Sequence, residues 1–169
     1  MKDEIISVSY DKKRVPIGWS AVLGAGVIAS VVFQLLEAVL IPLDGGGHPW
    51  GPARMIAAML IGPSVLSLPA TLDVGILAVA LIVDFALAIA YTAVLSVLIR
   101  RWPLGRAILV GAIFGATLYL VNFYGFTTVF PWFVIGRNRV TLFTHVAFSV
   151  TAVMAYKNLQ GRSKLVNSV

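Results

Sequence analysis

Cysteine is absent from the sequence and charge is scarce. The 169 residues include no cysteine, two histidines and seven Asp or Glu, and only 12% of them are charged. The absence of cysteine excludes disulfides, thiolate metal sites and thiol catalysis. With 59% hydrophobic residues, the chain has too few polar side chains to cover a soluble globule of this size. The mean hydropathy of +0.94 indicates an integral membrane protein instead.

Long apolar runs are what the sequence does contain. Four of them reach about 17 to 26 residues, which as helices cross roughly 30 Å of hydrocarbon. They cover residues 17–40, 74–99, 107–123 and 140–156. The sequence therefore predicts an all-α integral membrane bundle of four transmembrane helices. The membrane domain spans residues 17–157, between a cytoplasmic N-terminal segment (1–16) and a cytoplasmic C-terminal tail (158–169).

A fifth apolar block, from Ala53 to Leu68, is too short to cross. Its helical part stops at Pro63, and about ten helical residues reach only about 15 Å, half of a bilayer. Proline within the block also removes a backbone hydrogen bond. Irregular backbone is tolerated at membrane depth only when protein covers it or water reaches it. The block is therefore predicted to be a re-entrant half-helix that packs against the four spans or another subunit.

The distribution of basic residues supports the re-entrant topology. If the fifth block returns to the side it came from, ten of the 13 Lys and Arg residues lie inside, and Arg54, Arg137 and Arg139 lie outside. If the block crosses, six lie inside and seven outside. The positive-inside rule favours the first arrangement, with both termini cytoplasmic. Because these residues flank apolar blocks, the net charge of +6 reflects membrane orientation and not nucleic-acid binding.

Small residues at four-residue spacing predict close helix packing. Gly111 and Gly115 form a GxxxG pair, and Ala21, Ala25 and Ala29 repeat the spacing on the first span. Small residues let helix backbones approach each other in lipid. The pattern is compatible with packing inside one chain and with dimerisation.

Four polar side chains fall inside the apolar runs. Glu37 lies roughly 7 Å and Asp84 roughly 16 Å from the outer end of its span, by the helical rise per residue. Asn122 approaches the outer end of the third span, and His145 lies near the start of the last. Ionisable groups at membrane depth usually face protein or water and often mark function. These four residues are predicted to line an outward-opening polar pocket.

The chemistry of that pocket is open at the level of sequence. It is suited to hold a cation, to relay protons or to bind a small polar ligand. Alternatively, the polar residues form an internal hydrogen-bond network that fixes helix register, or Glu37 or Asp84 pairs with Arg54, Arg137 or Arg139.

Metal binding and catalysis have no support in the pattern. His48 and His145 are the two histidines, and neither HxxxH nor ExxH spacing occurs around them. We therefore expect no metal, no haem and no other cofactor. No serine or threonine stands in a recognisable nucleophile motif, so we expect no enzyme.

The C-terminal half resembles a known family. The residues that carry the resemblance are Asn122-Phe123-Tyr124-Gly125-Phe126, Phe130-Pro131-Trp132-Phe133, Arg137-Asn138, His145 and Ala155-Tyr156-Lys157, preceded by Arg54 to Ala58, Gly62-Pro63 and Pro69-Ala70-Thr71. They resemble short bacterial multi-span membrane proteins whose members often carry the label "sodium:proline symporter". Four spans are too few for the paired inverted repeats of solute–sodium symporters. A histidine often stands in the family where this chain has Asp84.

The combined prediction is a small, non-enzymatic protein of the bacterial inner membrane with an outward-facing polar pocket. It would act as an accessory or oligomeric transport-type component, with the lipid bilayer and a homo-oligomer or larger membrane complex as partners. The alternative is a structural scaffold or assembly subunit whose buried polar residues only fix helix packing.

Overall fold

The computed structural model describes residues 17–45, 47–68 and 71–166, and every regular element in this part of the chain is helical. The long helices are α1 (Trp19–Leu43), α3 (Val74–Ile99), α4 (Leu104–Leu120) and α5 (Arg139–Val166). With the turns that continue α4, all four are long and apolar enough to cross a membrane. The short apolar helix α2 (Gly51–Ile61) lies between the first two in sequence. The predicted all-α fold class is therefore confirmed.

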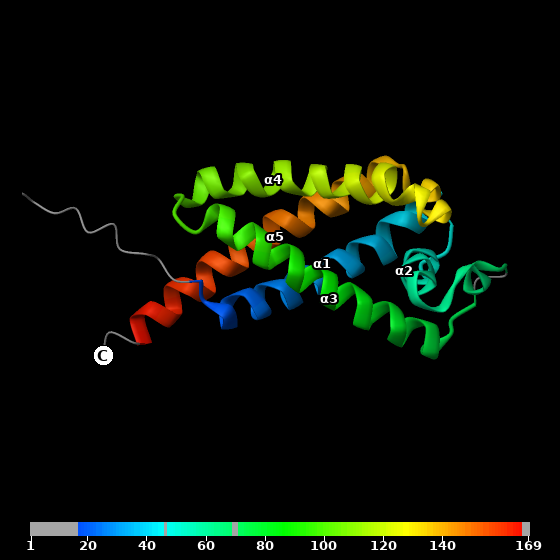
Figure 1. Cartoon of the computed structure of the whole chain (residues 1–169), viewed down its shortest axis with the longest axis horizontal. Helices are drawn as coiled ribbons and strands as arrows, with labels where there is room; N and C mark the ends of the chain where they lie inside the picture. Colours follow the sequence, from blue (N-terminus) through cyan, green and yellow to red (C-terminus); the bar gives the residue numbers. More distant parts are fainter. Residues whose placement is uncertain (1–16, 46, 69–70, 167–169) are drawn as a thin grey trace, which may run out of the picture.

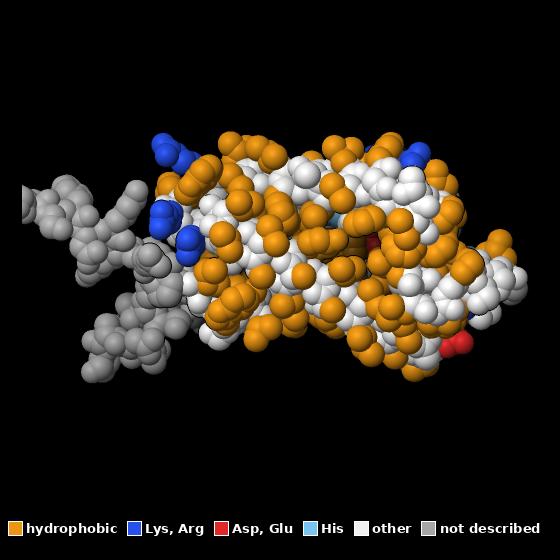
Figure 2. All heavy atoms as spheres, viewed as in Figure 1, with side chains coloured by type: hydrophobic (Ala, Val, Ile, Leu, Met, Phe, Trp, Pro, Cys, Tyr) orange, Lys and Arg blue, Asp and Glu red, His pale blue; other side chains and the backbone are white. Residues whose placement is uncertain are grey.

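After α1, the chain stays at one end of the bundle through α2 and starts α3 from that same end. Figure 1 shows α1 ending and α3 beginning at the same end of the bundle, with α2 beside them. We call this the α2 end, and the opposite end, where α3 stops and α4 starts, the basic end. Arg100, Arg101 and Arg106 belong to the basic end, where Figure 2 shows Lys and Arg side chains gathered. Which end faces the cytoplasm stays a prediction.

The ends of α2 follow from backbone chemistry. Pro52 stands in its first turn, where a missing N–H costs no helical bond. Gly62 ends the helix with φ of 97°, a conformation that glycine adopts without steric cost. The 3₁₀ turn η1 (Pro63–Leu66) follows. In the loop before α2, Gly45 and Gly47 also have positive φ, and Gly46 lies outside the described residues.

A buried arginine fastens this half-helix to the loop behind it. The guanidinium of Arg54 donates to the carbonyl oxygens of Val65 and Thr71, each at 2.6 Å. The Arg54 side chain is 8% exposed. One planar group thus ties α2, η1 and the approach to α3 together, and α2 also packs along α3.

Of the predicted spans, only the second matches its boundaries at both ends, and α1 runs two to three residues later than predicted at each end. The third span starts at Leu104 and becomes a π-helical turn, η2 (Val121–Gly125), before η3 (Phe126–Thr128) and η4 (Pro131–Gly136). The last helix does not end near residue 157 but continues to Val166, so most of the predicted tail is helical. The Lys157 ammonium donates to the carbonyl of Trp102 at 2.8 Å, which attaches α5 to the turn before α4.

The half of the bundle toward the basic end is a tightly packed core. Its largest fully buried side chains come from α1, α3 and α5 and include Val22, Leu95, Ile99, Val153 and Tyr156, while α4 contributes the fully buried Ala107. From α4, Gly111 and Gly115 lie directly against the backbone of α5. The outer surface carries exposed large apolar side chains, as lipid contact requires, including Leu35, Val39, Ile82, Leu109 and Ile113.

The four long helices are not packed equally. The pairs α1–α5 and α4–α5 have the most extensive contacts, and α1–α3 follows. In contrast, α3 and α4 barely touch. The bundle is therefore tight around α5 and open between α3 and α4.

Candidate functional site

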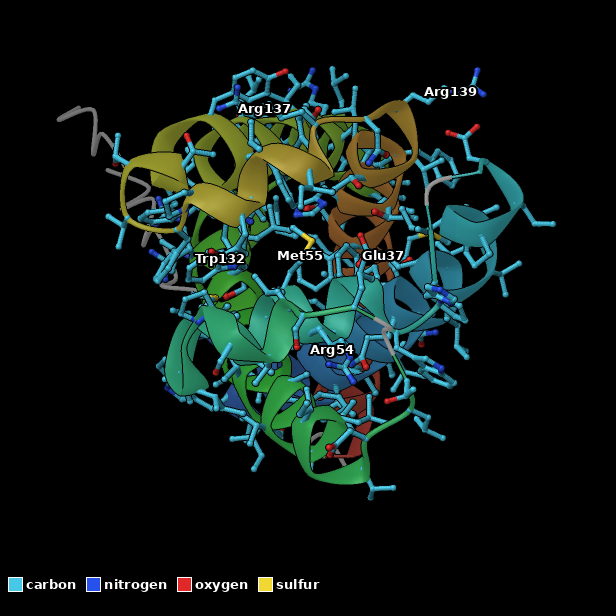
Figure 3. The ribbon with its side chains drawn as sticks, turned by 90° about the vertical axis from the view of Figure 1, so that its right-hand side faces the viewer. Glu37, Arg54, Met55, Trp132, Arg137 and Arg139 are labelled. Atoms are coloured by element: carbon cyan, nitrogen blue, oxygen red, sulfur yellow. The ribbon has the colours of Figure 1, made fainter. Side chains whose placement is uncertain are left out.

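A cavity of about 140 Å³ lies inside the bundle toward the α2 end. Helices α1, α3 and α5 form its walls, and α2 and the segment η2–η4 close it at the end. All four predicted pocket residues line it, namely Glu37, Asp84, Asn122 and His145. In the end view of Figure 3, Glu37 and Met55 point toward the space at the centre of the bundle.

Aromatic side chains make up much of the remaining wall. Five of them line the cavity, and they come from α1, α3, η2, η4 and α5: Phe33, Tyr91, Phe123, Phe133 and Phe148. An apolar segment gives no signal of which of its aromatic residues faces a cavity, so the sequence did not identify them.

Glu37 is held by α5. The Thr144 hydroxyl donates to Oε1 of Glu37 at 3.2 Å and also lies 3.0 Å from the carbonyl oxygen of Thr141. A hydroxyl has a single hydrogen, so these two acceptors share it. Oε2 of Glu37 accepts no hydrogen bond from any residue that the structure describes.

Asp84 is held by α1. Its Oδ2 atom accepts hydrogen bonds from the Ser30 hydroxyl at 2.6 Å and from the Gln34 amide at 3.2 Å. Ser30 and Gln34 are one turn apart and share a helical face. Within the described chain, Oδ1 of Asp84 has no hydrogen-bond donor. Each carboxylate thus uses one oxygen to join two helices and keeps the other free.

His145 and Asn122 are hydrogen-bonded to each other. Nδ1 of His145 lies 2.8 Å from the carbonyl oxygen of Thr141, and a carbonyl only accepts, so Nδ1 carries the hydrogen. Nε2 is then the acceptor for the Asn122 amide at 3.4 Å. The Tyr91 hydroxyl donates to the other side of that amide, also at 3.4 Å. The Phe33 and Phe123 rings pack edge-on against the imidazole, with centroids 5.1 and 5.4 Å away.

The structure therefore brings the four residues around one space in two hydrogen-bonded groups. The carbonyl oxygen of Thr141 accepts from Nδ1 of His145 and shares the Thr144 hydroxyl with Glu37, so Glu37 and the pair of His145 and Asn122 are linked through α5. Asp84 bonds to Ser30 and Gln34 of α1 and forms a group of its own.

The arginines do not neutralise these acids, so the ion-pair interpretation is wrong. Arg54 binds backbone carbonyls, as described above. Arg137 donates to the carbonyl of Phe123 at 2.7 Å and stacks over the Tyr124 ring. Arg139 pairs with Asp44 at the exposed α2 end, and this hydrogen bond lowers the pKa of Asp44 below its ordinary value.

A second, mostly apolar cavity of about 230 Å³ adjoins the first between α1, α2 and α3. Glu37 and Asp84 line both cavities, and so do Pro52 and Ile56 of α2. Gln34 lines the second cavity only. The two carboxylates therefore stand at the boundary between two spaces, with α2 as the shared wall.

Among the described residues, no group of three or more histidine or acidic side chains is arranged to hold a metal ion. His48 lies in the exposed loop before α2. No protein family model, no curated protein and no solved structure matches the chain. The family resemblance of the C-terminal half stays a prediction, and the function is argued from the cavity.

Proposed function

We propose that this multi-pass membrane protein is a non-enzymatic component of transport in the bacterial inner membrane that holds a small cationic ligand in its cavity. One observation carries the proposal. Glu37 and Asp84 each leave one carboxylate oxygen without a protein donor at the wall of the same cavity.

The cost of acids at this depth supports a ligand. Asp84 is ten residues from the start of α3, about 15 Å along the helix axis. A carboxylate near the membrane centre costs about 2.5–3.5 kcal/mol on insertion scales. No lysine or arginine of the described chain lines the cavity, so a bound cation is the group that would satisfy both free oxygens.

The basic residues predict how the protein is oriented in the membrane. If Arg100, Arg101 and Arg106 stay in the cytoplasm, as the positive-inside rule predicts, the α2 end and its cavity face outward. We therefore propose that the cavity lies in the outward-facing half of the protein.

The scaffold alternative keeps one specific argument. Several hydrogen bonds of the cavity wall join two helices, such as those of Ser30 with Asp84 and of Thr144 with Glu37. A protein that needed these residues only for helix register would show the same bonds.

Substitutions that keep or remove the charge of Glu37 and Asp84 distinguish the cation-binding proposal from the scaffold alternative. We would measure thermal unfolding of the protein in lipid nanodiscs with Na⁺, K⁺ or tetramethylammonium added. The proposal expects at least one cation to raise the melting temperature of the parent and of Asp84→Glu, but not of Asp84→Asn or Glu37→Gln. Asp44→Asn removes an acid outside the cavity and is the matched control. If no cation stabilises the parent, and the Asn and Gln variants fold and melt like it, the scaffold alternative holds.

A further inference from the structure

The cavity opens sideways, toward lipid. Helices α3 and α4 barely touch. Among the described side chains, the hydrogen bond from Tyr91 to Asn122 is the one that joins α3 to the continuation of α4, and it is long at 3.4 Å. Figure 2 shows a hollow in this face of the molecule with an acidic side chain at its floor. The acids that line the cavity are Glu37 and Asp84.

Apolar side chains cover the cavity at the α2 end. Met55 and Ile56 of α2 close the cavity there together with Phe133. The Trp132 indole donates to the carbonyl of Met55 at 3.1 Å, and these residues form one apolar cluster. A ligand that came through this end would have to open that cluster, whereas the gap between α3 and α4 is already present.

The lining selects a kind of cation. Two free carboxylate oxygens face a cavity with five aromatic side chains, and aromatic faces attract ammonium ions, especially away from water. An alkali ion would find few oxygen ligands in such a wall. The volume of about 140 Å³ matches a group about the size of benzene, which occupies a cavity of about 150 Å³ in another protein.

Building on the cation site proposed above, we infer that the ligand is an amphipathic ammonium ion that enters from the bilayer between α3 and α4. Its head sits between Glu37 and Asp84, and its alkyl chain leaves through the gap into lipid. We choose Leu87 to test this gap because it lines the cavity from α3, is partly exposed, and lies one helical turn from Tyr91, which bonds to the continuation of α4.

Two probes with the same head and different tails test this inference in lipid nanodiscs. Tetramethylammonium fills only the cavity, whereas dodecyltrimethylammonium, at low mole fraction, also needs the gap. Leu87→Trp fills the gap, and Ile82→Trp adds the same side chain at a lipid-facing site of α3, 69% exposed and outside both cavities. We expect Leu87→Trp to raise the concentration for half of the thermal shift by about tenfold, or about 1.4 kcal/mol, for the dodecyl compound only. Ile82→Trp should change neither.

The outcomes separate the two proposals. If neither probe shifts the parent and no alkali ion does, the cation site itself is wrong. If tetramethylammonium or an alkali ion binds but the dodecyl compound does not, or if Leu87→Trp weakens both probes equally or neither, the cation site stands and lateral entry is wrong.

A cysteine in place of Leu87 gives a further test that does not need the tryptophan variant to fold. On this cysteine-free chain, it should react with a lipid-soluble maleimide and be protected by the dodecyl compound. Crosslinking between two copies through this cysteine would overturn the inference, because a second copy would then cover the gap.

Discussion

Replacing Gly115 by alanine should loosen the contact between α4 and α5. A Cβ at this position would lie 2.7 Å from Cα of Val146 and closer still to the carbonyl oxygen of His145, both backbone atoms. Ordinary contact begins at 3.4 Å, so the helices would have to separate by at least 0.7 Å (3.4 minus 2.7). Such overpacking costs about 1–3 kcal/mol, while alanine gains up to about 1 kcal/mol over glycine as a helix former. If alanine makes the full gain of about 1 kcal/mol, the expected net loss is up to about 2 kcal/mol.

Two glycines of the same helix provide an internal scale. At Gly105 nothing lies within 4 Å of the new Cβ, so Gly105→Ala should be neutral or stabilising. At Gly111 the closest atom is Cγ2 of Val153, at 2.7 Å, a side chain that can move, so Gly111→Ala should fall between the other two. The assay is denaturant unfolding in mild detergent, with ligand binding as a second readout because Gly115 packs under His145. A Gly115→Ala variant as stable as Gly105→Ala would refute the reasoning.

Three further outcomes are expected. Arg54→Lys should speed amide hydrogen exchange in the η1 loop but not in α4, because one ammonium cannot reproduce the forked contact with two carbonyls; unchanged exchange in η1 would contradict this. Arg139→Gln should return the lowered pKa of Asp44 to its ordinary value in an NMR titration. The stabilisation from this pair is present above the ordinary pKa and should disappear as pH falls through the lowered one. A pKa of Asp44 that does not rise would contradict the role of Arg139. In intact cells, a cysteine at Ser67 should react with impermeant maleimide from outside and one at Arg101 only from the cytoplasm, and the opposite labelling would reverse the proposed orientation.

The spans were predictable because a bilayer imposes a length and a composition on any helix that crosses it. The residues of α3 match the predicted block at both ends, since Asp73 caps its start through the amide of Ile76 and the apolar run stops at Arg100. The short α2 was also predictable, because proline and glycine leave a helix few ways to continue. The end of α5 was not, because the helix continues to Val166 through polar residues that no apolar run marks.

The sequence predicted how deep the four site residues lie in the membrane, but not toward which neighbouring helix each side chain points. Counting residues along each helix places Glu37, Asp84, Asn122 and His145 near the same end of the bundle. The inner face of α3 was marked only by Asp84, Thr92 and Ser96, because the rest of the helix is apolar on every side, and such sparse polar residues do not say which helix each one meets. The partners Ser30 and Thr144 therefore could not be assigned to their acids from sequence.

The pairing of α1 with α5 has a consequence for how the protein is made. These are the first and last spans in the chain, and their contact is the most extensive in the bundle. During synthesis α1 enters the membrane long before α5 exists, so its row of small residues and Glu37 must wait without the neighbour that covers them. A chain stalled or cleaved before α5 would expose this face, and membrane proteases or chaperones that detect polar groups in lipid would meet it there. Completion of the four-helix bundle thus depends on α5, the last of its four spans to be synthesised.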